Sequence, residues 1–360
     1  MTDVSRKLVQ IFFATNQLKK DPGVEHAPPP VRVTRLGIIG AGFMGSGIAG
    51  TAVSQAEVDV RMKDADLARV AQGIRAAREI LDDRLTRRRI TRFEHARLVA
   101  LLSGGDGYAG FGRAELVIEA VFEDLAVKQQ VLQEVEVAMT ETAVFASNTS
   151  TIPITRIAEA ARVPARVIGM HFFSPVAKMP LLEVIPGART APGAVSTAVA
   201  FGRRIGKTVI VVRDSPGFWV NRILAPYANE IGYLLAEGAS IEDIDGMAVR
   251  FGFPVGPVTL LDEVGLDVAE KVAQVMLGAY GERLHHSGPG VPALVKAGRL
   301  GRKSGRGFYI YRGGKKRGVD ADVYRLLGVQ PNGGPRAAEI MQRLVLGMVN
   351  EAARAVGEGV

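Results

Sequence analysis

The sequence contains no cysteine, which excludes disulfide bonds and thiolate metal sites. Aromatic residues make up only 6% of the chain, and no apolar run reaches the length of a transmembrane helix. Histidines number five, and two of them, His285 and His286, are neighbours in a loop rich in Gly, Ser and Pro. We expect no metal site there, and no metal in the protein.

Acidic residues are fewer than basic ones, 37 against 45, which gives a net charge of +8. Such a balance suits nucleic acid, an anionic surface or an anionic substrate. The basic residues are not interleaved with aromatic ones, so we expect no nucleic-acid partner. One basic cluster has two interpretations, a solvated helix face or a binding site for a phosphorylated substrate; it consists of Arg84, Arg87, Arg88, Arg89 and Arg92.

One stretch, residues 35–49, joins a short apolar run to the pattern G-x-G-x-x-G at Gly40, Gly42 and Gly45. In a dinucleotide-binding fold the first glycine permits a tight turn and the second lets the backbone approach a pyrophosphate. The third lets the helix pack against the strand. The pyrophosphate would lie at the N-terminus of that helix, where N–H groups favour an anion. The alternative is a glycine-rich turn of another α/β protein.

An acidic residue, Asp64, ends a second apolar segment about twenty positions after the glycines. An acid at this place hydrogen-bonds the ribose hydroxyls and repels a 2′-phosphate, which favours NAD over NADP. The adjacent Lys63 acts in the opposite sense. We predict that the cofactor is NAD.

Apolar segments and helical patterns alternate from residue 33 to residue 213. We predict strands at 35–39, 58–62, 115–119, 143–146, 166–170, 181–185 and 208–212. We predict helices at 43–55, 66–86, 92–102, 125–139, 153–161 and 192–205. This order predicts an α/β fold with a Rossmann-like, doubly wound, mostly parallel sheet. After residue 217 the strand signals vanish, and helical patterns at 218–237, 240–250, 257–278 and 290–298, with a basic glycine-rich loop at 300–311, predict an all-helical C-terminal domain.

We divide the chain into four segments: a helix and Pro-rich linker (1–31), an NAD-binding domain (32–213), a helical domain for substrate binding or dimerisation (214–318) and the start of a second helical repeat (319–360). The repeat is visible because the pattern of 221–238 recurs, at a constant offset, in 342–359. The second copy stops at Val360, so we expect an excised fragment or one product of a split gene. Coincidence between two amphipathic helices is the alternative.

A candidate base, His171, lies at the end of a predicted strand, where open α/β sheets bind ligands. Histidine suits the transfer of a hydroxyl proton because its unperturbed pKa is near neutrality. Glu183 lies in the next apolar strand, where an acid is costly to bury without a partner. In a His–Glu pair the histidine would be the partner that the buried acid needs, and the carboxylate would stabilise the imidazolium that forms when the base takes up a proton. The alternative is a histidine that is buried in the core with its hydrogen bonds made and has no catalytic role, beside a glutamate of an edge strand.

Several motifs occur together and in order: Gly40–Gly45, Glu119–Asp124, Ala146–Ser150, His171–Val176, Asp214–Phe218, Asn221-Arg222 and Gly301–Gly305. On these motifs the chain resembles the L-3-hydroxyacyl-CoA dehydrogenase family over residues 32–360. The resemblance is strongest to the dehydrogenase part of the multifunctional α-subunit of the fatty-acid β-oxidation complex. It implies reversible, NAD-dependent oxidation of (3S)-3-hydroxyacyl-CoA to 3-oxoacyl-CoA.

The resemblance also implies residue roles. His171 would be the general base, Glu183 would orient it, Ser150 would bond the reacting oxygen or the nicotinamide side, and Asn221 would contact substrate. Implied cofactor contacts are Gly40, Gly42, Met44, Gly45, Asp64, Val121, Glu123, Lys128, Ser150, Ser174 and Lys303. Implied substrate contacts are Arg84, Arg88, Lys128, Ser150 and Asn221. Many members have Asn where Ser174 stands, and serine has less reach.

The same resemblance implies an acyl-CoA substrate, a hydratase/isomerase domain and a thiolase subunit as partners, and no transmembrane segment. A homodimer is one outcome, because the family often dimerises through the helical domain. The implied location is the cytoplasm of a bacterium, with the mitochondrial matrix as the alternative.

Two other functions stay open from the residues. One is a dehydrogenase for small hydroxy acids, which usually places a lysine rather than a His–Glu pair at the proton-handling position. The other is a non-enzymatic module that keeps NAD binding for structure or assembly; binding without turnover would distinguish it.

Overall fold

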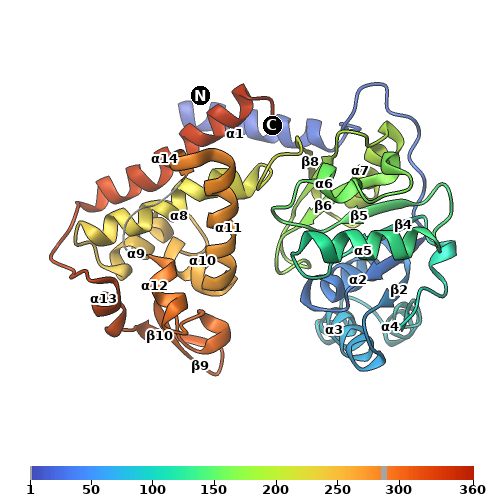
Figure 1. Ribbon diagram of the computed structural model, residues 1–360, viewed down its shortest axis with the longest axis horizontal. Coiled ribbons are helices and arrows are strands. Elements are labelled where there is room, and N and C mark those ends of the chain that lie inside the picture. The colour runs from blue at the N-terminus through green and yellow to red at the C-terminus, as the bar shows by residue number, and fades with distance from the viewer. Residues whose placement is uncertain (1, 285–289) are drawn as a thin grey trace. The chain divides into compact units, whose positions relative to one another are not determined.

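The apolar segments of the first 214 residues form one eight-stranded sheet with the order β3-β2-β1-β4-β5-β6-β7-β8 (Figure 1). Its strands are β1 (Arg35–Ile39), β2 (Asp59–Lys63), β3 (Leu102–Gly105), β4 (Leu116–Glu119), β5 (Val144–Ser147), β6 (Val167–Phe172), β7 (Leu181–Pro186) and β8 (Thr208–Val211). All neighbours pair in parallel except β6 and β7, which are antiparallel. The order begins 3-2-1-4-5-6, which is that of the Rossmann fold.

The computed structural model describes residues 2–284 and 290–360, which form two units, 1–214 and 215–360. His285 and His286 lie outside the described residues. The predicted α/β fold with a helical C-terminal domain is confirmed. None of the described helices is both long and apolar enough to span a bilayer.

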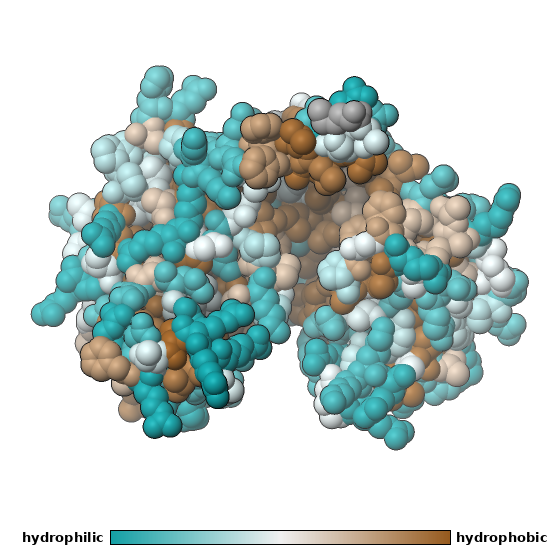
Figure 2. Space-filling view, turned by 180° about the vertical axis from the view of Figure 1, so that it is seen from behind, coloured by the Kyte–Doolittle hydropathy of each residue, from teal (hydrophilic) through white to brown (hydrophobic). Residues whose placement is uncertain are grey.

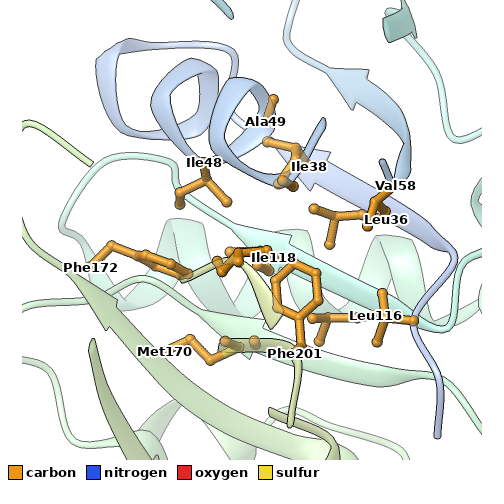
Figure 3. Close-up of a cluster of buried hydrophobic side chains, with 14 of the residues drawn as sticks. Leu36, Ile38, Ile48, Ala49, Val58, Leu116, Ile118, Met170, Phe172 and Phe201 are labelled. Carbon is orange, nitrogen blue, oxygen red and sulfur yellow. The ribbon is translucent and has the colours of Figure 1, made fainter. Parts of the chain in front are cut away.

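Helices cover both faces of the large sheet, as expected for parallel strands buried on both sides. They are α2 (Phe43–Ala56), α3 (Leu67–Thr86), α4 (Arg92–Val99), α5 (Leu125–Glu136), α6 (Ile154–Ala158) and α7 (Pro192–Arg204). Figure 3 shows the core beneath α2, where Ile48 and Ala49 face Ile38 and Ile118 of the central strands. The same packing that buries these side chains fixes the start of α2 against the end of β1.

One edge strand, β3, is absent from the predicted elements. Its four residues, Leu-Ser-Gly-Gly, carry no β-branched side chain and no alternation that would indicate a strand. The predicted helix over 92–102 instead ends at Val99, and the chain turns into β3 beside β2.

The N-terminal helix α1 (Asp3–Leu18) exposes its apolar side chains, including Leu8 and Phe12. Figure 2 shows apolar surface at the top of the view, over α1. The linker after α1 contacts the sheet domain, because a Cβ added to Gly23 would meet Val211 and Val199 of β8 and α7. The predicted linker thus packs against the sheet domain of the first unit.

The second unit consists mainly of helices. They are α8 (Val220–Ala236), α9 (Ile241–Phe251), α10 (Pro257–Val264), α11 (Leu266–Tyr280), α12 (Val291–Lys296), α13 (Asp322–Leu327) and α14 (Ala337–Gly357). Short 3-10 turns are η1 (Phe111–Arg113) and η2 (Pro164–Arg166) in the first unit, and η3 (Gly281–Leu284) and η4 (Arg302–Ser304) in the second. The predicted single helix over 257–278 is divided at Gly265, whose φ of +102° ends α10 before α11 begins.

Sequence analysis missed a small hairpin in this unit, β9 (Tyr309–Arg312) paired with β10 (Lys315–Val319). It lies partly within the segment predicted to be a loop, so the unit is not entirely helical. Tyr309 and Tyr311 are buried on one side of β9, and Gly313 and Gly314 turn the chain with positive φ. A strand of four residues is too short for its alternation to stand out among glycines and basic residues.

The two helices that carry the internal repeat, α8 and α14, are joined by two sets of arginine–glutamate ion pairs. In each set an arginine of one helix bonds glutamates in the C-terminal half or at the C-cap of the other. Arg222 of α8 bonds Glu351 of α14 at 2.8 Å and Glu358, the C-cap of α14, at 2.6 Å. Arg343 of α14 bonds the two repeat-related residues, Glu230 of α8 and Glu237, the C-cap of α8, both at 2.5 Å. Such reciprocity is expected when two related helices pack about a local two-fold axis, and it supports the repeat over coincidence.

Candidate active site

The segments that carry the predicted site follow the carboxyl ends of neighbouring strands. Matching positions on β1, β4, β5 and β6 are held by Ile39, Glu119, Ser147 and Gly169. Because these strands are parallel, the residues that follow them lie along one edge of the sheet. They are the Gly40–Gly45 loop, Val121, Ser150 and His171.

The glycine loop has the geometry that its spacing predicts. Gly40 has φ of +94°, and a Cβ added to Gly45 would lie 1.8 Å from the carbonyl oxygen of Gly40. Those two positions therefore require glycine for the turn and for the close contact of helix and strand. At Gly42, by contrast, an added Cβ would meet no described atom within 4 Å. Gly42 thus faces open space, as needed for a ligand that approaches the backbone.

The start of α2 is joined to the end of β2 by Asp64. One carboxylate oxygen accepts the N–H of Ala41 and the other accepts that of Ala65, each at 2.7 Å. Gly42 is the N-cap of α2 and provides no side-chain cap, so the helix N–H groups, including that of Met44 in the first turn, face the loop. Lys63 lies with Nζ 4.9 Å from the ring centroid of Tyr108.

Replacement of Asp64 tests the cofactor preference. We expect Asp64→Ala to weaken NAD binding about tenfold to a hundredfold, since a hydrogen bond to a charged group contributes about 1.5–3 kcal/mol. NADP binding should improve relative to NAD because the 2′-phosphate no longer meets a carboxylate. The measurement is kcat/KM with each cofactor. Asp66→Ala, which removes the neighbouring cap of α3, should preserve the preference; an unchanged preference in Asp64→Ala would exclude a ribose contact.

The two residues predicted to handle the proton are directly opposite each other in the antiparallel pair β6–β7. Oε2 of Glu183 lies 2.7 Å from Nδ1 of His171. Both side chains are buried, and Glu183 is 0% exposed. With Nδ1–H donating to the carboxylate, the basic nitrogen of the imidazole is Nε2. The pair that sequence analysis set against a plain core histidine is therefore formed.

Glu123 fixes the turn that contains Ser150. Its Oε1 accepts hydrogen bonds from the hydroxyl of Thr149 (2.7 Å), from N–H and hydroxyl of Ser150 (2.9 and 3.1 Å) and from N–H of Thr151 (3.0 Å). Burial acts to raise the pKa of Glu123, but the Lys128 ammonium and these hydrogen bonds outweigh it, so the pKa lies below its ordinary value. The carboxylate stays charged and holds the Ser150 hydroxyl at the sheet edge.

Lys128 does not line an open cleft. Its side chain is 0% exposed, with Nζ 2.9 Å from Glu119 and 3.5 Å from Glu123. Glu119 also accepts the N–H of Val121 and the hydroxyl of Ser147, both at 2.7 Å. The expectation that Lys128 contacts the substrate directly is therefore corrected. Its ammonium group instead pairs with the carboxylates of Glu119 and Glu123, beneath the carboxyl edge of the sheet.

The basic cluster divides into two parts. Arg84 is half-buried, and its Nη1 donates to the carbonyl and hydroxyl oxygens of Ser54, which joins α3 to α2. Arg88, Arg89 and Arg92 instead line a surface depression at the turn between α3 and α4. Arg88 there has φ of +55°, which ends α3 and directs the chain toward α4. This geometry favours Arg88 over Arg84 as a contact for a phosphate.

Two predicted site residues belong to the second unit. Asn221 lies in the first turn of α8. Lys303 lies in η4, with Nζ 2.5 Å from Oδ1 of Asp267, and this contact lowers the pKa of Asp267. In the first unit Ser174 is exposed, shortly after β6. Among residues 2–284 and 290–360 no group of His, Asp and Glu side chains is arranged to hold a metal.

A family model described as the NAD binding domain of 3-hydroxyacyl-CoA dehydrogenase matches residues 35–215. The chain belongs to the 3-hydroxyacyl-CoA dehydrogenase family. A second model, described as the C-terminal domain of 3-hydroxyacyl-CoA dehydrogenase, matches residues 217–311. The family resemblance seen in the motifs is confirmed, and so is NAD as the cofactor of the first unit.

Relatives of this dehydrogenase chain include the fatty acid oxidation complex subunit alpha of Vibrio cholerae, 45% identical over 100% of this chain and 50% of the relative. The chain thus spans about half the length of that curated relative. A solved (S)-3-hydroxybutyryl-CoA dehydrogenase of Ralstonia eutropha is 37% identical, with a TM-score of 0.74 over 78% of this chain and 100% of that one. The dehydrogenase part of multifunctional enzyme 1 of C. elegans, 24% identical with a TM-score of 0.66 over 96% of this chain and 81% of that one, shares the fold.

Sequence analysis missed two positioning residues of this dehydrogenase site. Asn148 accepts the N–H of Phe172 through its side-chain oxygen at 2.9 Å, which joins the end of β5 to the end of β6 beside His171. Asp214 accepts the N–H groups of Ile154 and Thr155, each at 2.7 Å, at the start of α6. Both lie in motifs that the resemblance used. For Asn148 the available signal was a polar residue immediately after a buried strand.

Proposed function

We propose that this chain catalyses the reversible oxidation of (3S)-3-hydroxyacyl-CoA to 3-oxoacyl-CoA. The observation that carries the proposal is the buried His171–Glu183 pair, which lies at the same edge of the sheet as the glycine loop. Nε2 of His171 accepts the proton of the 3-hydroxyl. NAD, when bound, would supply the acceptor for the hydride that leaves C3. In the reverse direction the imidazolium returns the proton to the alkoxide oxygen.

Glu183 has two tasks in this proposal. It holds the tautomer in which Nδ1 carries hydrogen, and it stabilises the imidazolium formed when Nε2 is protonated. Because Glu183 is fully buried, its charge acts on His171 through a medium of low dielectric, where the interaction is stronger than in water. The hydroxyl of Ser150, which donates to Glu123 in this structure, would turn to donate to the reacting oxygen, while the Ser150 N–H stays bonded to Glu123. Asn221 would contribute a polar contact to the substrate.

The glycine loop, Met44, Val121 and Ser174 would hold the dinucleotide together with Asp64, and Lys303 would add a contact from the second unit. Open space at Gly42 and the absence of a side-chain cap from Gly42 fit a pyrophosphate at the start of α2. Glu123 and Lys128 act indirectly, since they fix the turn carrying Ser150. Arg88 would contact the phosphates of CoA, with Arg84 as its support through Ser54.

Charge reversal tests the CoA contact. We expect Arg88→Glu combined with Arg89→Glu to raise KM for acetoacetyl-CoA about tenfold or more, since each phosphate loses a charge-assisted hydrogen bond. The KM for the N-acetylcysteamine thioester of acetoacetate, which lacks the phosphates, should not change. The exposed pair Arg113→Glu with Arg162→Glu has the same net charge change and serves as control. An equal rise in KM for both substrates would mean that the basic cluster acts only through the overall charge of the protein and does not contact the CoA phosphates.

We further propose that the chain acts as the dehydrogenase portion of a fatty-acid oxidation complex, in the bacterial cytoplasm. The name of the Vibrio cholerae relative and its greater length support this proposal. A hydratase must supply the 3-hydroxyacyl-CoA by adding water to a 2-enoyl-CoA. A thiolase must consume the 3-oxoacyl-CoA by cleaving it with CoA.

The direct test of the reaction is stereochemical. The full chain with NAD should reduce the cofactor in the presence of (3S)-3-hydroxybutyryl-CoA, and the (3R) isomer should react at least about a hundredfold more slowly because its hydroxyl cannot reach His171 while C3 faces the nicotinamide. The absorbance of NADH measures both rates. Equal rates for the isomers would contradict this assignment of the site.

A further inference from the structure

Lys63 is the last residue of β2 and immediately precedes Asp64, the acid expected to favour NAD over NADP. Its ammonium group opposes that preference, because a cation near the ribose attracts the 2′-phosphate of NADP. In the structure Lys63 is half-buried, and its Nζ lies 4.9 Å from the ring centroid of Tyr108. A lysine in this position is held by the attraction between its charge and the face of the aromatic ring.

The loop that carries Tyr108 is fixed to the end of β2. Gly105, the last residue of β3, is the register partner of Lys63 in the parallel pair β2–β3, so the residues after both strands lie at one edge of the sheet. Arg61 of β2 donates from Nε to the carbonyl oxygen of Ala109, at 3.1 Å. The backbone of this loop is therefore held beside Lys63.

Two further contacts fix the Tyr108 ring itself. The buried Phe111 packs edge-to-face against it, with ring centroids 5.6 Å apart and planes at 81°. The Tyr108 hydroxyl donates to Oε2 of Glu134 on α5, and Gln130 donates to Oε1 of the same carboxylate, both at 2.8 Å. The hydrogen bonds from Gln130 and Tyr108, with the charge of Lys63, hold the pKa of Glu134 below its ordinary value. Glu134 is therefore charged at neutral pH and attracts Lys63.

We propose that Tyr108 determines cofactor specificity, because its ring holds Lys63 away from the ribose that Asp64 binds and so lowers the affinity for NADP. Asp64 repels the 2′-phosphate, and the cation that would attract this phosphate is bound elsewhere. A second cation, Arg69, has Nη1 3.9 Å from Asp64, and it is unchanged in every variant below. The inference rests on the proposed ribose contact of Asp64, which Asp64→Ala tests separately, and not on the proposed reaction.

The test measures binding rather than turnover. Fluorescence titration of the full chain gives Kd for NADH and for NADPH, and the selectivity is Kd for NADPH divided by Kd for NADH. We expect Tyr108→Leu to lower the selectivity about fivefold, the size of one cation–π contact at a partly buried site. Kd for NADH should change little, because NADH lacks the phosphate that Lys63 would bind. Tyr108→Phe keeps the ring and should keep the wild-type selectivity.

A second substitution tests whether this effect acts through Lys63. Adding Lys63→Met to Tyr108→Leu should restore the wild-type selectivity, whereas Lys63→Met alone should leave the selectivity nearly unchanged, since the ring already holds the lysine away. An unchanged selectivity in Tyr108→Leu would overturn the inference. So would a lowered selectivity that persists after Lys63→Met is added.

Glu134→Gln provides a second variant if Tyr108→Leu does not fold, which a loss of NADH binding would reveal. It removes one of the two attractions on Lys63 and should lower the selectivity about twofold. Glu141→Gln makes the same change of charge at an exposed position before β5, at the opposite edge of the sheet, and should keep the wild-type value. Equal selectivities in these two variants would contradict the inference. The expected selectivities without turnover of 3-hydroxybutyryl-CoA would contradict only the proposed reaction.

Discussion

His171→Gln is expected to lower kcat by about 10²–10⁴, because glutamine cannot take the hydroxyl proton that Nε2 accepts. NAD affinity should change little, since the proposed cofactor contacts, among them the glycine loop and Asp64, are unaltered. Glu183→Gln should lower kcat by about ten- to a hundredfold, through loss of one charge-assisted hydrogen bond to the imidazolium. Steady-state kinetics with acetoacetyl-CoA and NADH, together with NADH fluorescence titration, measure both effects.

The chain provides a matched control for this prediction. His95 on α4 also pairs with a carboxylate, with Nε2 2.6 Å from Asp82, and it lies outside the proposed site. His95→Gln should therefore leave kcat at the wild-type value. A His171→Gln variant that also retains the wild-type rate would refute the assignment of the general base.

Lys128→Met should destabilise the first unit by about 3–5 kcal/mol, because it leaves the buried Glu119 and its neighbour Glu123 without their cation. For a domain of this size the melting temperature should fall by about 10 °C. Activity measured well below the melting temperature should also fall, since Glu123 positions Ser150. Thermal unfolding followed by circular dichroism measures the stability effect.

Combining Lys128→Met with Glu119→Gln should recover much of the lost stability, because the deepest uncompensated charge is then removed. The amide oxygen introduced by the second substitution can accept the N–H of Val121, and the amide NH2 can donate to the hydroxyl oxygen of Ser147, which now donates to the other carboxylate oxygen of Glu119. The exposed Arg97–Glu57 pair serves as comparison, and Arg97→Ala should not measurably change the melting temperature. No recovery in the double variant would mean that Lys128 acts through packing rather than through its charge.

The cofactor half could be predicted from sequence because each step depends on local constraints. Gly40 and Gly45 are required by a backbone angle and by a close contact, and both requirements leave a fixed spacing in the sequence. His171 and Glu183 could be paired because an isolated acid in a buried strand needs a partner. The strand pairing that places them opposite each other supplied the remaining geometry.

Other features depend on contacts between distant segments. The burial of Lys128 follows from Glu119 and Ser147 on neighbouring strands, and a lysine in a helix gives no sign of this. The hairpin β9–β10 has weak local signals, and its buried Tyr309 is fixed by Asp245 of α9, which accepts its hydroxyl at 2.8 Å.

The most direct test of the account is NADH consumption by the full chain with acetoacetyl-CoA. The account predicts turnover that is lost in His171→Gln and retained in His95→Gln. NADH binding without turnover in wild type would contradict it, and would instead favour a module that binds the cofactor without catalysis.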